Sequence, residues 1–244
     1  MDWTDRGVVL SARKHGENAI ILSLLTEDHG RHIGLVRGGT SRKTRGIYEP
    51  GNVLDAHWRA RLEDHLGSYA CELAQAHAAY ILDDPLRLAG LSSLCAILES
   101  ALPEREAHGP LYRDTLTLIE HFGEAQWLEN YVHFEVALLR ELGFGLDLAT
   151  CAATGRNDDL IYVSPRSGCA VSASAGEPYK DKLLPLPGFL IEETSGDASR
   201  AQILDGLRMT GYFLDRSVFV HSHVIGHSGT PPARERFIER LRRP

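Results

Sequence analysis

The sequence has no long apolar run. Its longest apolar segments are far shorter than the roughly 18 residues that a helix needs to cross a bilayer. The first residues, MDWTDRG, also lack the basic segment and the apolar segment of a secretory signal peptide. We therefore expect a protein of the cytoplasm.

Cysteine is scarce, with four residues in a chain of 244. Cys71 and Cys95 lie in apolar segments, whereas Cys151 and Cys169 lie in a short polar segment. Cysteines so placed do not make a disulfide framework for a chain this long. The hydrophobic fraction of 43% and the charged fraction of 24% are those of an ordinary soluble globular protein, with room for two or three compact units.

Signatures of catalysis are also missing. We find no P-loop, nucleophile elbow, paired metal motif or dinucleotide fingerprint. A metal-dependent hydrolase that uses His221, His223 and His227 is the weakest alternative, because helical periodicity would separate the first two by about 200°. We expect a protein that is not an enzyme.

An excess of positive charge is absent from the chain as a whole, whose net charge is −7 at pH 7. The distribution is uneven, however. Residues 1–80 carry ten Lys and Arg and ten Asp and Glu, and the remainder carries 16 against 23. From Arg31 to Arg61, seven basic residues are accompanied only by Glu49 and Asp55, which creates a local positive field.

Five short segments rich in β-branched and apolar residues occupy the beginning of the chain. They are separated by turn-forming residues and cover residues 6–12, 18–26, 31–37, 52–59 and 66–73. No helical period interrupts them. This pattern predicts a small closed barrel at residues 1–80, and the five-stranded OB barrel is the common design of this kind for binding nucleic acids.

The connection between the third and fourth segments, GGTSRKTRGIYEP at residues 38–50, is cationic. Such a loop can follow a phosphate backbone without fixing a sequence, although it could also be a solvated loop whose charges bind nothing. Trp58 and Tyr48 could stack on bases, or they could belong to the barrel core. We predict DNA contacts at the basic residues of the hairpin, the strands and the loop, which are Arg13, Lys14, Arg31, Arg37, Arg42, Lys43, Arg45 and Arg59.

Helical periodicity follows the barrel. Residues 86–102, 108–122 and 127–148 repeat apolar residues at helical spacing, and Asp84-Pro85 provides an N-cap and a first-turn proline. We expect a helical bundle at residues 81–146, completed by the C-terminal helices of residues 181–244. A barrel followed by a bundle makes the fold α+β and multi-domain.

The segment 127–148 is the longest helical pattern, and the glycines at 143 and 145 end it. Glu135 lies among its apolar residues, so we expect a structural partner for this carboxylate, from Arg, Tyr or the backbone. His133 and Arg140 lie on its polar stripe. We predict that they border a groove for an acidic peptide tail with an aromatic end.

Residues 147–180 form a predicted insert. Turn-forming clusters flank Leu160–Val163, and a second short strand at 169–172 would complete a hairpin. Cys151 and Cys169 are spaced like the two halves of a zinc ribbon, but Thr154 and Ser172 stand where each half needs its second thiol. We interpret the insert as zinc-finger-like with a degenerate site, and we expect no bound metal or cofactor.

Four segments together resemble the bacterial RecO recombination-mediator family. They are GVVLSARKHGENAIILSLLTEDHGR, the cationic GGTSRKTRG with YEPG, the helix end FEVALLRELGFGLDL with its downstream cysteine, and the closing GTPPARERF. Their order spans nearly the whole chain. The resemblance implies an OB barrel, a helical domain and a zinc-finger-like insert, although the family's four-cysteine pattern is kept only at Cys151 and Cys169.

The resemblance also implies a function in DNA repair and homologous recombination. A RecO-like protein binds single- and double-stranded DNA, anneals complementary strands and binds the C-terminal tail of single-stranded-DNA-binding protein. With RecR, and often RecF, it helps to load RecA at gaps, in the cytoplasm at the nucleoid. The alternative is an OB-fold protein that binds RNA or acts in translation.

Overall fold

The computed structural model describes residues 1–42, 44–191, 198–220 and 229–243. The predictions for Lys43, His221, His223 and His227 lie outside these residues. The chain divides into two compact units, residues 1–123 with 231–237 and residues 124–230 with 238–244. This partition differs from the four predicted segments, whose boundaries stay predictions.

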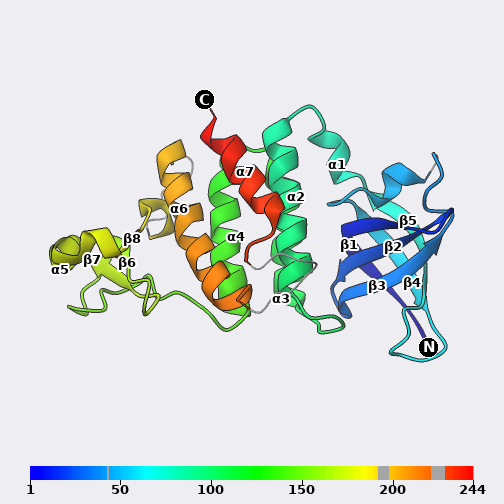
Figure 1. The fold of residues 1–244 in the computed structure, drawn as a ribbon, viewed down its shortest axis with the longest axis horizontal. Coiled ribbons are helices and arrows are strands. Elements are labelled where there is room, and N and C mark those ends of the chain that lie inside the picture. Colours follow the sequence, from blue (N-terminus) through cyan, green and yellow to red (C-terminus); the bar gives the residue numbers. More distant parts are fainter. Residues whose placement is uncertain (43, 192–197, 221–228, 244) are drawn as a thin grey trace. The chain divides into compact units, whose positions relative to one another are not determined.

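The first unit begins with five strands that close into a barrel (Figure 1). Neighbours around the barrel follow the order β1-β2-β3-β5-β4, and β1 also pairs with β4. Only β3 and β5 pair in parallel. The predicted succession of strands before helices, and with it the α+β class, is confirmed. The strands are β1 (Asp2–His15), β2 (Ala19–Thr26), β3 (Gly30–Arg37), β4 (Val53–Arg59) and β5 (Ser68–Gln75).

The barrel core comes from side chains that alternate along the strands. Val9, Leu22, Leu54 and Trp58 are among those that point inward and are fully buried. In β2 the alternation is lost, and nearly every residue is buried, because α2 and α3 cover the outer face of the barrel. A strand covered on both faces reads as a continuous apolar run, which explains the sequence AIILSLLT.

Three helices and a 3₁₀ turn complete the described part of unit 1 before residue 124. Asp84 accepts hydrogen bonds from the N–H groups of Leu86 at 2.9 Å and Arg87 at 3.1 Å, so the predicted N-cap is confirmed. Between the barrel and Asp84 the chain forms only a single helical turn, because β5 continues to Gln75. These elements are α1 (His77–Tyr80), α2 (Pro85–Ala101), α3 (Gly109–Glu120) and η2 (His121–Gly123).

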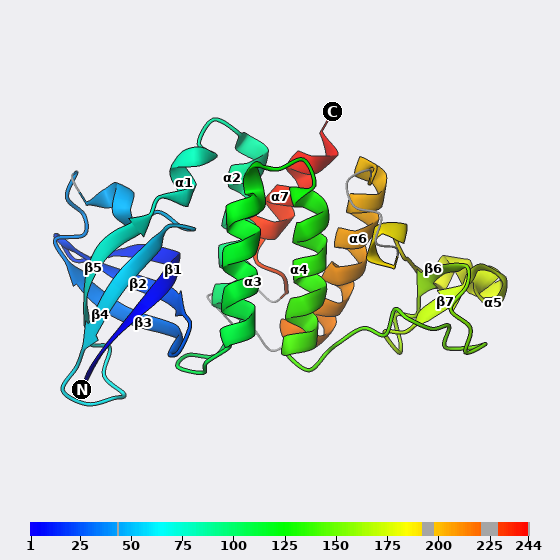
Figure 2. The ribbon, with the colours of Figure 1, turned by 180° about the vertical axis from the view of Figure 1, so that it is seen from behind.

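Unit 2 contains α4 (Trp127–Glu141) and α6 (Arg200–Phe213), which pack side by side (Figure 2). Gly143 has a φ of +85°, which confirms a left-handed glycine just after α4. A π-helical turn, η5 (Leu214–Val218), follows α6. The last helix, α7 (Pro232–Arg242), is divided between the two units.

Glu135 is fully buried in α4, and its Oε2 accepts a hydrogen bond from the Thr210 hydroxyl of α6. We expected an Arg, Tyr or backbone partner. Thr210 is a partner that this expectation did not name, because the pairing of α4 with α6 decides which side chain faces the carboxylate. The expectation of a structural partner is confirmed.

The insert contains the predicted hairpin and one further strand. Its sheet has the order β7-β6-β8, and β8 lies beyond the predicted end of the insert. Among the helices within the described ranges, none is long and apolar enough to cross a membrane. The insert and the turns that follow it comprise β6 (Leu160–Val163), β7 (Ala170–Ser172), α5 (Ala173–Gly176), η3 (Glu177–Lys182), β8 (Leu184–Pro185) and η4 (Gly188–Leu190).

Candidate nucleic-acid interface

Basic side chains gather at the end of the barrel where β1 ends, β2 begins and β3 ends. Lys14 pairs with Ile20 and His15 with Ala19 in the β1–β2 ladder, while Arg37 pairs with the same Ala19 in the β2–β3 ladder. Lys14 and Arg37 are both exposed. Strand register therefore places two cations close to one barrel end, which we call the basic rim.

The cationic loop leaves the basic rim directly after Arg37. The hydroxyls of Ser41 and Thr44 lie 2.7 Å apart, and the Thr44 hydroxyl donates to the Gly38 carbonyl at 3.0 Å. A 3₁₀ turn, η1 (Arg45–Tyr48), then returns the chain toward β4. Side-chain hydrogen bonds and a 3₁₀ turn thus order the described residues of this loop.

Arg42 and Arg45 are exposed on this loop. Within the residues that the structure describes, neither guanidinium makes an ion pair, and the same holds for Lys14 and Arg37. These four cations have no acidic partners among the described residues and lie close together in the fold. They make a surface that can bind the phosphate groups of DNA and release the counterions of those phosphates.

The other predicted DNA contacts do not add to this group: Arg13 lies beside Lys14 but pairs with an acidic residue, and Arg31 and Arg59 lie at the other barrel end. The Arg13 guanidinium donates to Glu99 of α2 at 3.0 Å. Arg59 is exposed at the far end of β4, opposite Asp2 in the β1–β4 ladder. The structure therefore does not bring all eight predicted residues to one groove, because the strands run the full length of the barrel and carry their two ends to opposite sides.

Arg31 also lies near that far end, and its side chain is only 13% exposed. Its Nε donates to the Leu102 carbonyl at 2.7 Å, and its Nη2 lies 3.6 Å from Glu104. Arg31 thus ties β3 to the segment that follows α2. Its role in DNA binding, like that of the other predicted contacts, stays a prediction.

The two aromatic residues singled out for base stacking belong to the core. Trp58 is 1% exposed and Tyr48 is 7% exposed. The Trp58 Nε1–H donates to the Leu66 carbonyl at 3.1 Å. Of the two alternatives, the core role is the observed one, because both side chains fill the inside of the barrel.

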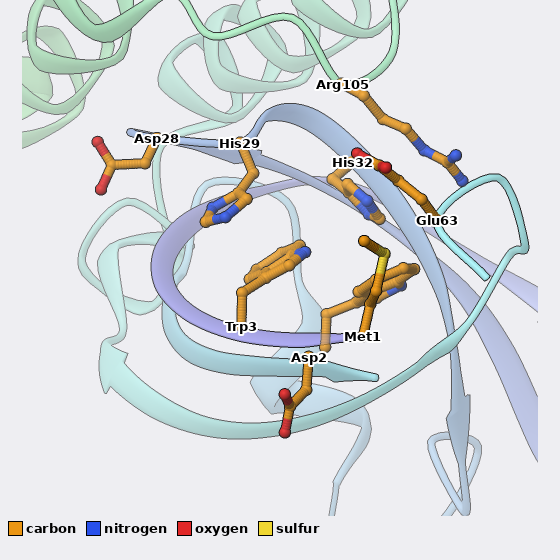
Figure 3. A pocket seen from close by; sticks show the side chains of 9 residues that line it. Met1, Asp2, Trp3, Asp28, His29, His32, Glu63 and Arg105 are labelled. Atoms are coloured by element: carbon orange, nitrogen blue, oxygen red, sulfur yellow. The ribbon is translucent and has the colours of Figure 1, made fainter. Parts of the chain in front are cut away.

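A pocket of about 460 Å³ lies at the barrel end opposite the basic rim (Figure 3). The rings of Trp3 and His29 are stacked there with centroids 4.1 Å apart. His29 Nδ1 lies 2.9 Å from Asp5. Sequence reasoning missed this pocket, since only strand pairing brings its walls together. The lining residues are Met1, Asp2, Trp3, Asp28, His29, His32, Trp58, Glu63 and Arg105.

His32 forms one wall of the pocket and is 3% exposed. Burial, assisted by the nearby positive charge of Arg105, lowers the pKa of His32 to about 4. Its Nδ1 lies 3.3 Å from the Tyr69 hydroxyl. At neutral pH this imidazole is therefore uncharged and can offer hydrogen bonds to a ligand without attracting anions.

The predicted peptide-binding residues lie on α4. Arg140 is exposed, and the His133 ring packs edge-on against Phe189 with centroids 5.7 Å apart. Partial burial lowers the pKa of His133. Glu129, on the same stripe, is buried and accepts the Ala198 N–H at 2.8 Å. Only part of the stripe is therefore open to a partner.

Cys151 is buried in the insert, and its Sγ accepts the N–H of Ser172 at 3.3 Å and lies 3.5 Å from the Ser172 hydroxyl. Burial raises the pKa of the thiol, but hydrogen bonds from the Thr154 and Ser172 side chains and from backbone N–H groups outweigh it. The resulting pKa is about 6. Hydroxyls thus occupy the positions of two zinc thiolates and donate to the sulfur.

This donor set does not fit structural zinc, which needs four strong ligands. In the described part of the chain, no group of three or more His, Cys, Asp or Glu is arranged to hold a metal ion. We therefore derive no role for zinc in the insert.

Comparison with known proteins assigns the family. The model described as "Recombination protein O N terminal" matches residues 1–76, and "Recombination protein O C terminal" matches residues 82–223. DNA repair protein RecO of Rhodospirillum centenum is 53% identical over 245 residues, covering 100% of this chain and 96% of that protein.

Two further relatives agree. DNA repair protein RecO of Rhodospirillum rubrum is 46% identical, covering 100% of this chain and 97% of its own length. The protein of the same name from Roseobacter denitrificans is 47% identical, covering 100% of this chain and 99% of its own length. The resemblance found in the sequence motifs is confirmed, and the chain belongs to the RecO family of DNA repair proteins.

Proposed function

We propose that this protein is a recombination mediator that binds single- and double-stranded DNA and anneals complementary strands. The observation that carries this proposal is the basic rim with its loop, where Lys14, Arg37, Arg42 and Arg45 are exposed without acidic partners. The barrel that presents them has the strand order of an OB fold, a common scaffold for nucleic acids.

Annealing follows from electrostatics. Two strands repel each other through their phosphates, and a surface that neutralises both of them lowers this repulsion. Such a protein needs no active site, so we propose that it acts without catalysis, without a cofactor and at the nucleoid in the cytoplasm.

Family membership supports further partners. We propose that the protein works with RecR, and with RecF where present, to load RecA onto DNA covered by single-stranded-DNA-binding protein. His133 and Arg140 on α4 would bind the acidic C-terminal tail of that protein. An Arg140→Glu protein that bound the tail peptide as tightly as the unchanged protein would refute this role of Arg140.

The decisive experiment is annealing of complementary oligonucleotides without nucleotide, compared between the unchanged protein and an R42E/K43E/R45E variant. We expect the variant to anneal at least tenfold more slowly at low salt. The matched control is R166E/K182E/R208E, which makes the same change in net charge at exposed positions outside the barrel.

Equal loss in both variants would show that total charge matters and the loop does not. If the unchanged protein neither anneals nor binds single strands at low salt, the mediator function fails. A preference for RNA over DNA of the same sequence at the same salt would favour the RNA-binding alternative.

A further inference from the structure

The pocket at the far end of the barrel is built around a column of three rings. The centroids of Trp58 and Trp3 are 5.7 Å apart with planes inclined by 20°, and those of Trp3 and His29 are 4.1 Å apart with planes inclined by 10°. His32 meets Trp3 edge-on at 5.0 Å. These rings form the apolar part of the pocket wall.

Trp3 presents its edge to the ligand. Both of its faces are covered, by Trp58 and by His29. Its Nε1–H donates to no group in the described part of the chain, and Figure 3 shows the indole nitrogen turned toward the side of the pocket that His32 forms. The pocket therefore contains a hydrogen-bond donor that a ligand can use.

Arg105 supplies a second donor. Its Nη2 donates to the His65 carbonyl at 3.0 Å, which holds the guanidinium in place. Its Nε is buried and has no hydrogen-bond partner among the described residues. That N–H is closed off from the pocket, so a ligand would accept from another N–H of the guanidinium, which lines the pocket.

The rim of the pocket is acidic. Asp2, Asp28 and Glu63 line it, against the guanidinium of Arg105 and the ammonium of Met1, which donates to the Ala60 carbonyl at 2.8 Å. Three carboxylates repel phosphate, so the ligand is not an anion. A cation would prefer an open ring face, and Trp3 has none. A neutral molecule that carries both acceptors and N–H donors satisfies these constraints.

We propose that this pocket binds one nucleobase that carries an exocyclic amino group, which means adenine, guanine or cytosine. A ring nitrogen or carbonyl of the base accepts from the Trp3 Nε1–H or from Arg105, and the amino group donates to Glu63. The sugar and phosphate stay outside the acidic rim. This inference rests on the proposed DNA binding and adds a base site separate from the basic rim.

Free deoxynucleosides, which have no phosphate, test the pocket by itself. The readout is the indole N–H signal of Trp3 in NMR spectra of the full-length protein, identified with a Trp3→Phe variant, with Trp127, which does not line the pocket, as the internal reference. We expect millimolar deoxyadenosine, deoxyguanosine or deoxycytidine to move the Trp3 signal. Thymidine, which lacks the amino group, should bind several-fold more weakly.

Glu63→Ala should weaken nucleoside binding about tenfold, and Glu63→Gln should do so to a smaller extent. Asp64→Ala is the matched control, because Asp64 is the exposed neighbour in the same loop and does not line the pocket. An unchanged Trp127 signal and an unchanged thermal unfolding midpoint in each variant would show that it is folded.

Two outcomes would overturn the base site. One is that no nucleoside moves the Trp3 signal although the protein still anneals DNA. This result would refute the base site and leave the proposed function standing. The other is a signal that N-acetylarginine amide moves and nucleosides do not, which identifies a site for a cationic side chain. Nucleoside binding without any DNA binding would support the pocket and refute the mediator function.

Discussion

At the scale of single residues, burial decides which polar groups keep their ordinary chemistry. Glu135 remains in an apolar helix face because Thr210 of α6 donates to it. His32, inside the barrel end, has the pKa of its imidazole lowered to about 4, first by burial and then by Arg105. Neither effect can be read from the neighbours in sequence, since the groups responsible lie far along the chain.

The low pKa of His32 predicts acid sensitivity. The folded state binds the proton less readily than the unfolded chain, so its contribution to stability is complete above pH 6.5 and declines as the pH falls toward 4. We expect this histidine to account for roughly 2 kcal/mol of the free energy of unfolding lost between pH 7 and pH 4.5.

Urea unfolding at both pH values measures the effect. His32→Gln should lose less stability between them than the unchanged protein does. His15→Gln, at an exposed position near the end of β1, should keep the original pH dependence. Equal pH dependence in all three proteins would contradict the prediction.

At the scale of elements, the closed barrel depends on close approaches at glycines, and Gly34 is an example. A Cβ placed on Gly34 of β3 would lie 2.5 Å from Cδ2 of Tyr69 and 3.2 Å from Cδ1 of Trp58. These rings fill the core and cannot retreat easily, since barrel interiors are closely packed. Gly34 is therefore a position at which the barrel tolerates no side chain.

Gly34→Ala should lower the free energy of unfolding by about 1 to 3 kcal/mol through overpacking. Gly46→Ala in η1 is the control, because its added Cβ would meet no atom within 4 Å. Thermal unfolding compares the two, and a Gly34→Ala protein as stable as the control would show that the rings can move.

The insert offers a second prediction at this scale. Thr154 and Ser172 both form side-chain hydrogen bonds with the Cys151 sulfur, so their side chains already face one centre. A T154C/S172C variant should bind about one equivalent of zinc, because it would supply four thiolates together with Cys169. T154S/S172T is the control, and metal analysis after dialysis that found no zinc in the cysteine variant would refute the shared centre.

At the scale of the whole molecule, positive and negative side chains gather in different places, and the net charge does not show this. The chain carries −7, yet one barrel end has a group of unpaired cations and the other has an acidic pocket. We expect a protein with this charge distribution to bind phosphate at the basic rim and to repel it elsewhere. Its affinity for DNA should therefore depend on few contacts.

If four or five cations contact a single strand, log K should fall with log salt concentration with a slope of about −3. Fluorescence anisotropy with a labelled oligonucleotide measures this slope. The R42E/K43E/R45E variant should reduce its magnitude by about 2, and R166E/K182E/R208E should leave it unchanged. A steeper slope that the loop variant did not alter would place the main DNA contacts on another surface.

Much of the fold could be predicted from local patterns. The alternation in β4, the turn residues between strands and the Asp84-Pro85 start of α2 are each contained in a few neighbouring residues. The candidate interface was only partly predictable, because a basic residue such as Arg31 looks the same in sequence whether it binds a ligand or the Leu102 carbonyl.

The sequence by itself determined the succession of strands and helices, the family and the cationic loop, since these depend on residue types at short spacing. Tertiary structure alone decided that Arg13 pairs with Glu99, that Arg31 and Arg59 lie away from the basic rim, and that Trp3 meets His29. These outcomes depend on strand register and on contacts between residues distant in the chain, and no local pattern records them.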